Sequence, residues 1–143
     1  MPNRRAFDHI GAYNFKVEIE GVTMGAFRNV EGLDSETTVV EFQDGDDMVL
    51  RKRPGRTKYS NITLKRGFVN DPALWEWRKK VIDGVVERKS GSVILCADDG
   101  TEVVRYNFFE AWPSKWKGFT LDGKGDDVTV EEVELAVEKI ERA

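Results

Sequence analysis

The stretch YNFKVEIEG, residues 13–21, alternates strictly between apolar and polar side chains. Its apolar residues, from Tyr13 to Ile19, fall on one side of an extended chain, and the polar residues fall on the other. A period of two is typical of a β-strand with one buried face. Because a turn follows this strand, we expect the segment VTMGAFRNV, residues 22–30, to return beside it as a second strand.

A second pair of strands flanks the turn sequence DGDD at residues 44–47. ETTVVEFQ, residues 36–43, is rich in β-branched side chains, and MVLRKR, residues 48–53, follows the turn. An Asp-Gly pair between two such segments predicts a hairpin, here a long one with an acidic tip. We expect the Pro-Gly pair at residues 54–55 to break its second arm, and residues 58–67 to resume as another strand.

One helix is predicted within NDPALWEWRKKVIDG, residues 70–84. Asp71 can cap the free N–H groups, Pro72 suits the first helical position, and Gly84 suits the end. The spacing of three and four residues predicts an apolar face that packs on a sheet. This face is expected to comprise Leu74, Trp77 and Val81, together with Trp75 or Ile82.

The remaining chain continues the β pattern. Residues 92–112 read as a strand, a DDG turn and a longer strand, and residues 113–127 read as a polar, Gly-rich surface loop. The final segment, residues 128–140, fits both periods: a capping box at Thr129 slightly favours a helix, whereas alternation around Val133 favours a strand. The pattern alone leaves both open.

Length and composition bound the fold and the class of protein. With 143 residues, 40% of them apolar, the chain is expected to form one domain over residues 1–143, with a flexible N-terminal arm at residues 1–11. No run approaches the roughly 20 apolar residues that cross a bilayer, and no signal peptide is recognisable, so we expect no membrane insertion and synthesis in the cytoplasm. The single cysteine, Cys96, lies in an apolar run and is expected to be buried and inert.

No pattern of catalytic or metal-binding residues is found. His9 is the only histidine, which excludes a zinc site built on several histidines. Because it lies in an arm that we expect to be mobile, we do not expect it to act in a catalytic triad. The aspartates of residues 44–47 lack the glycine and the final glutamate of a calcium loop. Trp112, Trp116 and Phe119 could form a ligand platform, but aromatic residues at the exit of a strand are more often a hydrophobic plug. We therefore expect no enzyme activity and no cofactor.

The charge distribution is polarised although the formal net charge is only −4. Residues 51–67 contain seven Lys and Arg and no acid, whereas residues 122–143 contain eight acids and three bases. The basic segment could bind nucleic-acid phosphates, with Tyr59 available for stacking. Alternatively, it could face acidic residues of a neighbouring copy in an assembly, and the many strand edges make pairing between copies physically natural.

Three motifs carry a resemblance to a known family: EGL-x-SE at residues 31–36, PG-x-x-KY-x-N-x-TLKRG at residues 54–67 and WP-x-K-x-x-G at residues 112–118. With the order of the surrounding segments, they cover nearly the whole chain. The chain resembles the tail tube proteins of contractile phage tails and the inner tube subunits of phage-like contractile injection systems. It is also similar in architecture to the tube protein of type VI secretion.

The resemblance implies a mainly β fold: a small antiparallel β-barrel or two-sheet sandwich with one packed helix. It makes the last segment a strand, and a β-bulge at Glu131 and Glu132 would let both halves of that strand face the core. It implies a structural, self-assembling protein that forms hexameric rings stacked around a lumen and that sheath contraction propels. No active site is carried over.

The implied partners are other copies, the sheath protein, baseplate and spike proteins, a length-setting protein, and protein cargo or DNA in the lumen. The particle would be assembled in the cytoplasm and then released or anchored. We favour an injection-system tube over its alternatives, a contractile phage tail tube that conducts DNA or, less favoured, a nucleic-acid-binding β module. The expected contacts between subunits or rings are the acidic tip and the basic arm of the hairpin: Asp44, Asp46, Asp47, Arg51, Lys52, Arg53, Arg56 and Lys58.

Overall fold

The computed structural model describes residues 11, 14–20, 27–67, 72–121, 123–125 and 130–143. These residues form nine strands and one helix. In chain order the elements are β1 (Phe15–Ile19), β2 (Phe27–Glu31), β3 (Ser35–Phe42), β4 (Arg51–Tyr59), β5 (Ile62–Gly67), α1 (Ala73–Ile82), β6 (Lys89–Cys96), β7 (Glu102–Lys117), β8 (Val130–Ala136) and β9 (Lys139–Arg142). The prediction of a mainly β fold with one helix is confirmed.

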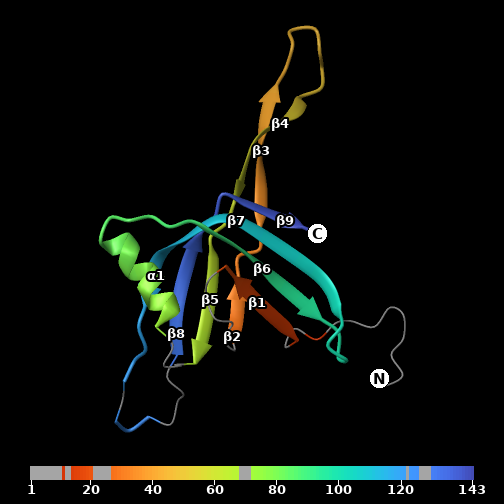
Figure 1. The fold of residues 1–143 in the computed structure, drawn as a ribbon. Helices are drawn as coiled ribbons and strands as arrows, with labels where there is room; N and C mark the ends of the chain where they lie inside the picture. The colour runs from red at the N-terminus through yellow and green to blue at the C-terminus, as the bar shows by residue number, and fades with distance from the viewer. Residues whose placement is uncertain (1–10, 12–13, 21–26, 68–71, 122, 126–129) are drawn as a thin grey trace.

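Seven of the strands build two antiparallel layers that share β7 (Figure 1). Layer 1 consists of β1, β6, β9 and residues 102–109 of β7, and layer 2 consists of β2, β5, β8 and residues 112–117 of β7. Between the two parts of β7, Glu110 has a positive φ of 54°. This unusual backbone conformation marks the point where the strand passes from one layer to the other. Of the two predicted arrangements, a small β-barrel or a two-sheet sandwich, these layers correspond to the sandwich.

The core lies between the layers. Layer 2 contributes Ile62, Leu64 and Leu135, all at most 1% exposed, because alternate residues of β5 and β8 point inward. From layer 1, Phe108 is fully buried, and a β-carbon at Gly91 would lie 2.4 Å from its ring. Each such apolar side chain contributes about 1.5–3 kcal/mol on burial, so these residues hold the layers together.

Helix α1 closes one side of the sandwich. Leu74 and Trp77 are buried in the core, as the spacing predicted, and the indole Nε1 of Trp77 donates a hydrogen bond to the carbonyl oxygen of Glu87 at 2.6 Å. Trp75 is 43% exposed, and its ring and that of Trp116 pack edge to face with centroids 5.3 Å apart. The alternative face residue, Ile82, is 58% exposed and lies outside the core. The helix packs against β7, as expected for a helix on a sheet.

The remaining two strands, β3 and β4, pair only with each other and project as a hairpin from the body (Figure 1). The long hairpin with an acidic tip was predicted correctly, but its second arm does not break at residues 54–55. Instead β4 runs through Pro54, because the register shifts by one residue there and the extra residue is accommodated as a bulge.

Two other predictions about strand pairing and extent are wrong. The segment that includes β2 does not return beside β1: β1 pairs with β6, which places Val17 opposite Val93 in the core, and β2 pairs with β5. In addition, residues 113–117 belong to β7 rather than to a loop, because Trp116 and its neighbours pair with β8.

The final segment forms β8 and β9, as the family resemblance implied and the helical period did not. The expected bulge at Glu131 and Glu132 is absent, since β8 pairs with β5 without a register shift from residue 130 to residue 135. Glu131 points inward instead, and its carboxylate lies 3.7 Å from Nε of the buried Arg66. This charge pair makes an inward acid tolerable without a bulge.

Several predictions fall outside the described residues. These are the N-terminal arm apart from Gly11, and the positions of His9, Asp71 and Thr129. Pro72 occupies the N-cap position, one residue before the first helical residue. Within the described residues, no helix has the length and apolar character needed to cross a membrane.

Candidate functional site

The hairpin leaves the body at a tight joint formed by residues 32–34 and 60–61. Gly32 has a φ of +96°, a backbone conformation that residues with a β-carbon rarely adopt. A β-carbon there would lie 2.0 Å from the carbonyl oxygen of Asn61. Across the joint, the hydroxyl of Ser60 donates to the carbonyl oxygen of Gly32 at 2.5 Å and accepts from the backbone N–H of Asp34 at 3.2 Å. These contacts fix the direction in which the hairpin projects.

All eight charged residues predicted to form subunit contacts lie on this hairpin. Once the bounds of the hairpin are known, its charges balance: residues 35–59 contain five acids and five bases, a formal net charge of zero. Lys52 lies opposite Glu41 and Lys58 opposite Glu36 in the register of the two strands. Part of the acidic counterpart of the basic segment is therefore in the same hairpin, where like charges on neighbouring strands are avoided.

The tip of the hairpin is ordered by Asp47. Its carboxylate accepts a hydrogen bond from Nε of Arg51 at 2.6 Å and another from the backbone N–H of Val49 at 3.0 Å. Both bonds lower the pKa of Asp47, and the bond from Arg51 has the larger effect. Of the predicted residues, the structure thus brings Asp47 and Arg51 together within one chain. Arg53 lies opposite Val40 rather than opposite an acid.

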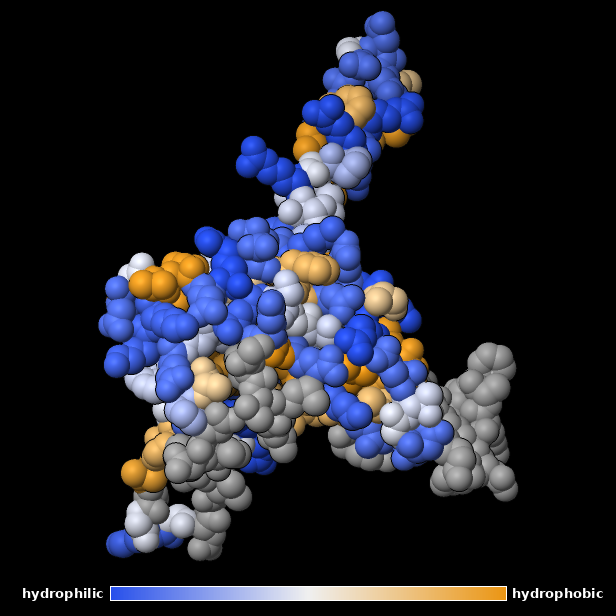
Figure 2. Space-filling model, in the orientation of Figure 1, coloured by the Kyte–Doolittle hydropathy of each residue, from blue (hydrophilic) through white to orange (hydrophobic). Residues whose placement is uncertain are grey.

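The hairpin also carries apolar side chains that the sequence analysis did not single out. Five of them are between 44% and 97% exposed: Val39, Phe42, Met48, Val49 and Leu50. Figure 2 shows hydrophobic residues along the outer part of the projection, among hydrophilic ones. A two-stranded hairpin has no core of its own, so its apolar residues remain exposed until another surface covers them. That simple argument could have identified them from the sequence.

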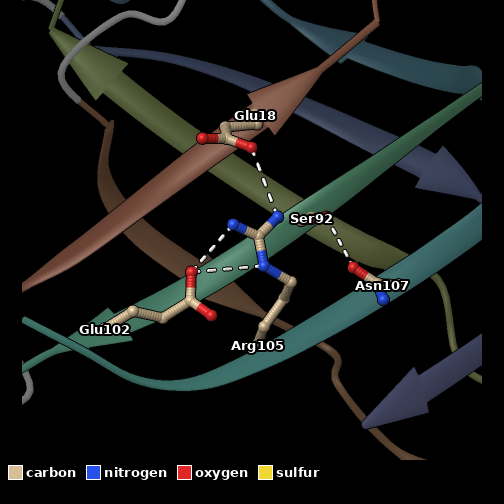
Figure 3. A network of polar contacts seen from close by, with 5 residues as sticks. All are labelled: Glu18, Ser92, Glu102, Arg105 and Asn107. Atoms are coloured by element: carbon tan, nitrogen blue, oxygen red, sulfur yellow. Dashed lines mark hydrogen bonds and ion pairs between the residues drawn. The ribbon is translucent and has the colours of Figure 1, made fainter. Parts of the chain in front are cut away.

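A second polar surface covers the outer face of layer 1, the face turned away from the core. Arg105 on β7 donates from Nη2 to Glu102 at 2.8 Å and from Nη1 to Glu18 on β1 at 3.3 Å (Figure 3). The hydroxyl of Ser92 donates to the Oδ1 atom of Asn107 at 2.6 Å. Beside this network lies a shallow groove of about 520 Å³ whose lining includes Glu18, Ser92 and Asn107.

The edges of the layers differ in their availability for pairing. Among the described strands, β1 pairs only with β6 and β9 only with β7, so both are open edges of layer 1. Layer 2 ends at β2 on one side and at residues 112–117 of β7 on the other. There α1 intervenes, with Nη1 of Arg78 donating to the carbonyl oxygen of Pro113 at 3.4 Å. Layer 1 is therefore the sheet that a neighbouring chain can extend on both sides.

No cluster of three or more metal-ligating side chains occurs in the described part of the chain. Cys96 is a free, buried thiol, as predicted. Trp116 packs against the core, whereas Phe119 is 36% exposed, so the predicted hydrophobic plug stays a prediction. The exposed features that remain as candidates for contact are the hairpin, the open edges and the outer face of layer 1.

Comparison with known families identifies the chain. Residues 11–141 match the family model of the T4-like virus tail tube protein gp19. The chain belongs to this family. It is a tail tube subunit of a contractile injection system or phage tail, a structural protein and not an enzyme. No significant match was found among curated protein sequences.

Several solved structures are similar to this tail tube protein in sequence and fold. A chain of the extended sheath–tube complex of PVC, an extracellular contractile injection system, shares 28% identity, with a TM-score of 0.83 over 96% of this chain and 93% of that one. A chain in the tube-terminating cap of the anti-feeding prophage shares 25% identity, with a TM-score of 0.84 over 99% and 95%.

A type six secretion system protein has the same fold at 13% identity, with a TM-score of 0.56 over 90% of this tail tube protein and 82% of that chain. The similarity in architecture to type VI secretion is therefore confirmed for the fold.

Proposed function

We propose that this tail tube protein is the inner tube subunit of a contractile injection system and that its copies form hexameric rings stacked into a hollow tube. The observation that carries the proposal is the pair of open edges in layer 1, on a molecule that also projects an uncovered hairpin. Such edges and apolar surfaces are costly in a monomer and are covered when copies associate. The sequence identities of 28% and 25% with chains of the PVC and anti-feeding prophage particles favour an injection system.

Within a ring, β1 of one copy pairs with β9 of the next. The strand order makes this pairing antiparallel, because β1 runs opposite to β6, β6 opposite to β7, and β7 opposite to β9. Layer 2 covers one face of layer 1, so closing layer 1 into a barrel leaves its other face turned into the bore. The outer face with Arg105 is then the wall of the lumen.

Between rings, the hairpin supplies the contact. It extends beyond the body, so its tip reaches a second copy rather than its own layers (Figure 1). Its exposed apolar residues provide the buried area, and the charges that its own strands do not oppose, such as Arg53 and Asp44, set the register with the neighbouring ring. Exposed ion pairs contribute only about 0–1 kcal/mol each, so their role is register more than affinity.

The tube is assembled in the cytoplasm together with sheath, baseplate, spike and length-setting proteins, in a particle that is released or anchored. Contraction of the sheath drives the tube, and protein cargo lies in the bore. A contractile phage tail that conducts DNA is the second candidate, because the matching family model is that of a phage tail tube protein. The balanced charge of the hairpin weighs against a nucleic-acid-binding module.

Electron microscopy of the protein purified with its baseplate tests this proposal, and we expect rings with sixfold symmetry and hollow filaments of uniform width. Detection of this chain only as dispersed monomers in such particles would exclude it. Arg53→Glu combined with Arg56→Glu should impair elongation while the subunit stays folded. Lys52→Glu is the control, since it places two acids opposite each other inside the hairpin and should disturb the isolated subunit as well.

A further inference from the structure

The guanidinium of Arg105 is held on the outer face of layer 1 by two carboxylates. Glu102 accepts from its Nη2 at 2.8 Å and from its Nε at 3.3 Å, and Glu18 accepts from its Nη1 at 3.3 Å. Glu18 belongs to β1 and Arg105 to β7, so the contact spans the intervening strand β6 (Figure 3). This explains why an arginine lies here: it ties the open edge strand to the middle of the layer.

The other cations of this face also have acids beside them. The register places Lys16, Arg105 and Lys139 on the same face. Lys139 lies 2.5 Å from the carboxylate of Glu141. The hydrogen bond from Arg105 is the main cause that lowers the pKa of Glu102, and the positive charge of Lys16 adds a smaller contribution. Between them Ser92 and Asn107 are hydrogen-bonded to each other and uncharged. Arg105 and Lys139 therefore already have carboxylate partners within the same chain.

A free arginine on such a surface would behave differently. Its planar group forms bidentate hydrogen bonds with phosphates and carboxylates, and it stays charged at any physiological pH. One copy in every subunit of a stacked tube would make a regular array of anion-binding groups along the bore. Such an array retains polyanions, with an affinity that falls steeply as salt rises.

We propose that Glu18 and Glu102 mask the charge of Arg105, so that this face does not retain polyanionic cargo, whether nucleic acid or acidic protein segments. The consequence for the bore rests on the function proposed above, whereas the masking itself is a property of the single subunit. The two carboxylates are thus specificity-determining residues for what can slide through the tube.

The test measures binding of a fluorescent single-stranded oligothymidine, by anisotropy, to the unassembled subunit and to tubes. Glu18→Gln with Glu102→Gln frees Arg105 and should tighten binding to the subunit. One further phosphate contact adds about 0.7 to the slope of log affinity against log salt, which corresponds to a roughly eightfold higher affinity at about 50 mM salt. Adding Arg105→Gln should abolish the gain. Glu76→Gln on α1 with Asp83→Asn at its C-cap removes the same charge from exposed positions and should change binding far less.

Two results overturn the proposal: no gain on freeing Arg105, or a gain that persists after Arg105→Gln. If the double Gln variant does not fold, the single variant Arg105→Gln decides. Because Arg105 is masked in the wild-type subunit, this variant should bind the oligonucleotide as weakly as the wild type does. A loss of binding would show that Arg105 is already available. Electron microscopy of the same samples separates the two levels. Absence of tubes argues against the proposed function, whereas unchanged oligonucleotide binding by folded subunits argues against masking.

Discussion

Replacing Gly32 by alanine tests the joint that directs the hairpin. The φ of +96° costs a residue with a β-carbon about 1–2 kcal/mol. The β-carbon would also lie 2.0 Å from the carbonyl oxygen of Asn61 and 3.2 Å from Cα of Ile62, which are backbone atoms that no rotamer change can move away. Overpacking of this kind costs about 1–3 kcal/mol more. Gly32→Ala should therefore destabilise the subunit by about 2–5 kcal/mol.

Two other glycines separate these contributions. Gly84 has a φ of +90° but no atom within 4 Å of a β-carbon, so Gly84→Ala should lose only about 1–2 kcal/mol. Gly45 at the hairpin tip has neither a positive φ nor a close atom, and Gly45→Ala should change stability by less than about 0.5 kcal/mol. Urea unfolding followed by tryptophan fluorescence, with linear extrapolation to water, measures all three.

Assembly adds a second readout. A domain in the middle of the usual range of about 5–15 kcal/mol remains largely folded after such a loss, so the Gly32→Ala subunit should be soluble while its joint is forced open. Its hairpin then points in another direction, and tubes should not elongate. If Gly32→Ala costs no more than Gly84→Ala and still supports normal tubes, the joint tolerates a β-carbon and our account of the hairpin's direction is wrong.

Leu74→Ala should lose about 2–5 kcal/mol in the same unfolding assay, because the side chain is 2% exposed in the core, whereas Trp75→Ala, at a site 43% exposed, should lose less; equal losses would contradict the described helix face. Cys96→Ala should leave tubes functional in an injection assay, and loss of injection by stable tubes would refute an inert thiol. The pKa of Asp47 in the folded chain is below its usual 3.8, so the ionised carboxylate stabilises the tip above that pH. This stabilisation should disappear as the pH falls through the lowered pKa. Amide hydrogen exchange at Val49 measures it, and a protection that stays unchanged in acid would contradict the pairing.

Local patterns predicted most strands because each pattern depends on which face is buried. The alternation that ends at Ile19, the Asp-Gly turn and the spacing of Leu74 and Trp77 all correspond to elements of the structure. Strand partners were not predictable in the same way, since pairing between distant segments is decided by the complete core. β2 joins β5 and not its neighbour in the chain for this reason.

The final segment shows where a local pattern misleads. Its apolar residues have the spacing of a helix, but β8 lies between β5 and β7 and is fixed as a strand by pairing with both. The inward position of Glu131 looked like a defect that needed a bulge, because nothing in the local sequence indicates that Arg66 lies beside it. A charge partner 65 residues away, as the numbering gives it, is a property of the fold.

The candidate contact residues were found by their charge, and that signal was incomplete. Charge along the sequence does not reveal that Lys52 and Lys58 already face acids across the hairpin. The apolar residues around Met48 were overlooked because they appeared to be ordinary strand residues. Arg105 and its two carboxylates could not have been grouped, since Glu18 is 87 positions away and meets it only through the order β1-β6-β7.

The continuity of β7 through both layers determines how a subunit responds to mechanical load. Two packed sheets without a common strand can shear past each other by exchanging side-chain contacts. Here a 16-residue strand is hydrogen-bonded into both sheets, so sliding would have to stretch covalent backbone or break ladders in both. We expect the remaining motion to be a rotation at Glu110, where the backbone φ is positive between the two parts of the strand. Axial thrust on a tube would accordingly be carried by peptide bonds, and the stiffness of each subunit would depend on the backbone at that one residue.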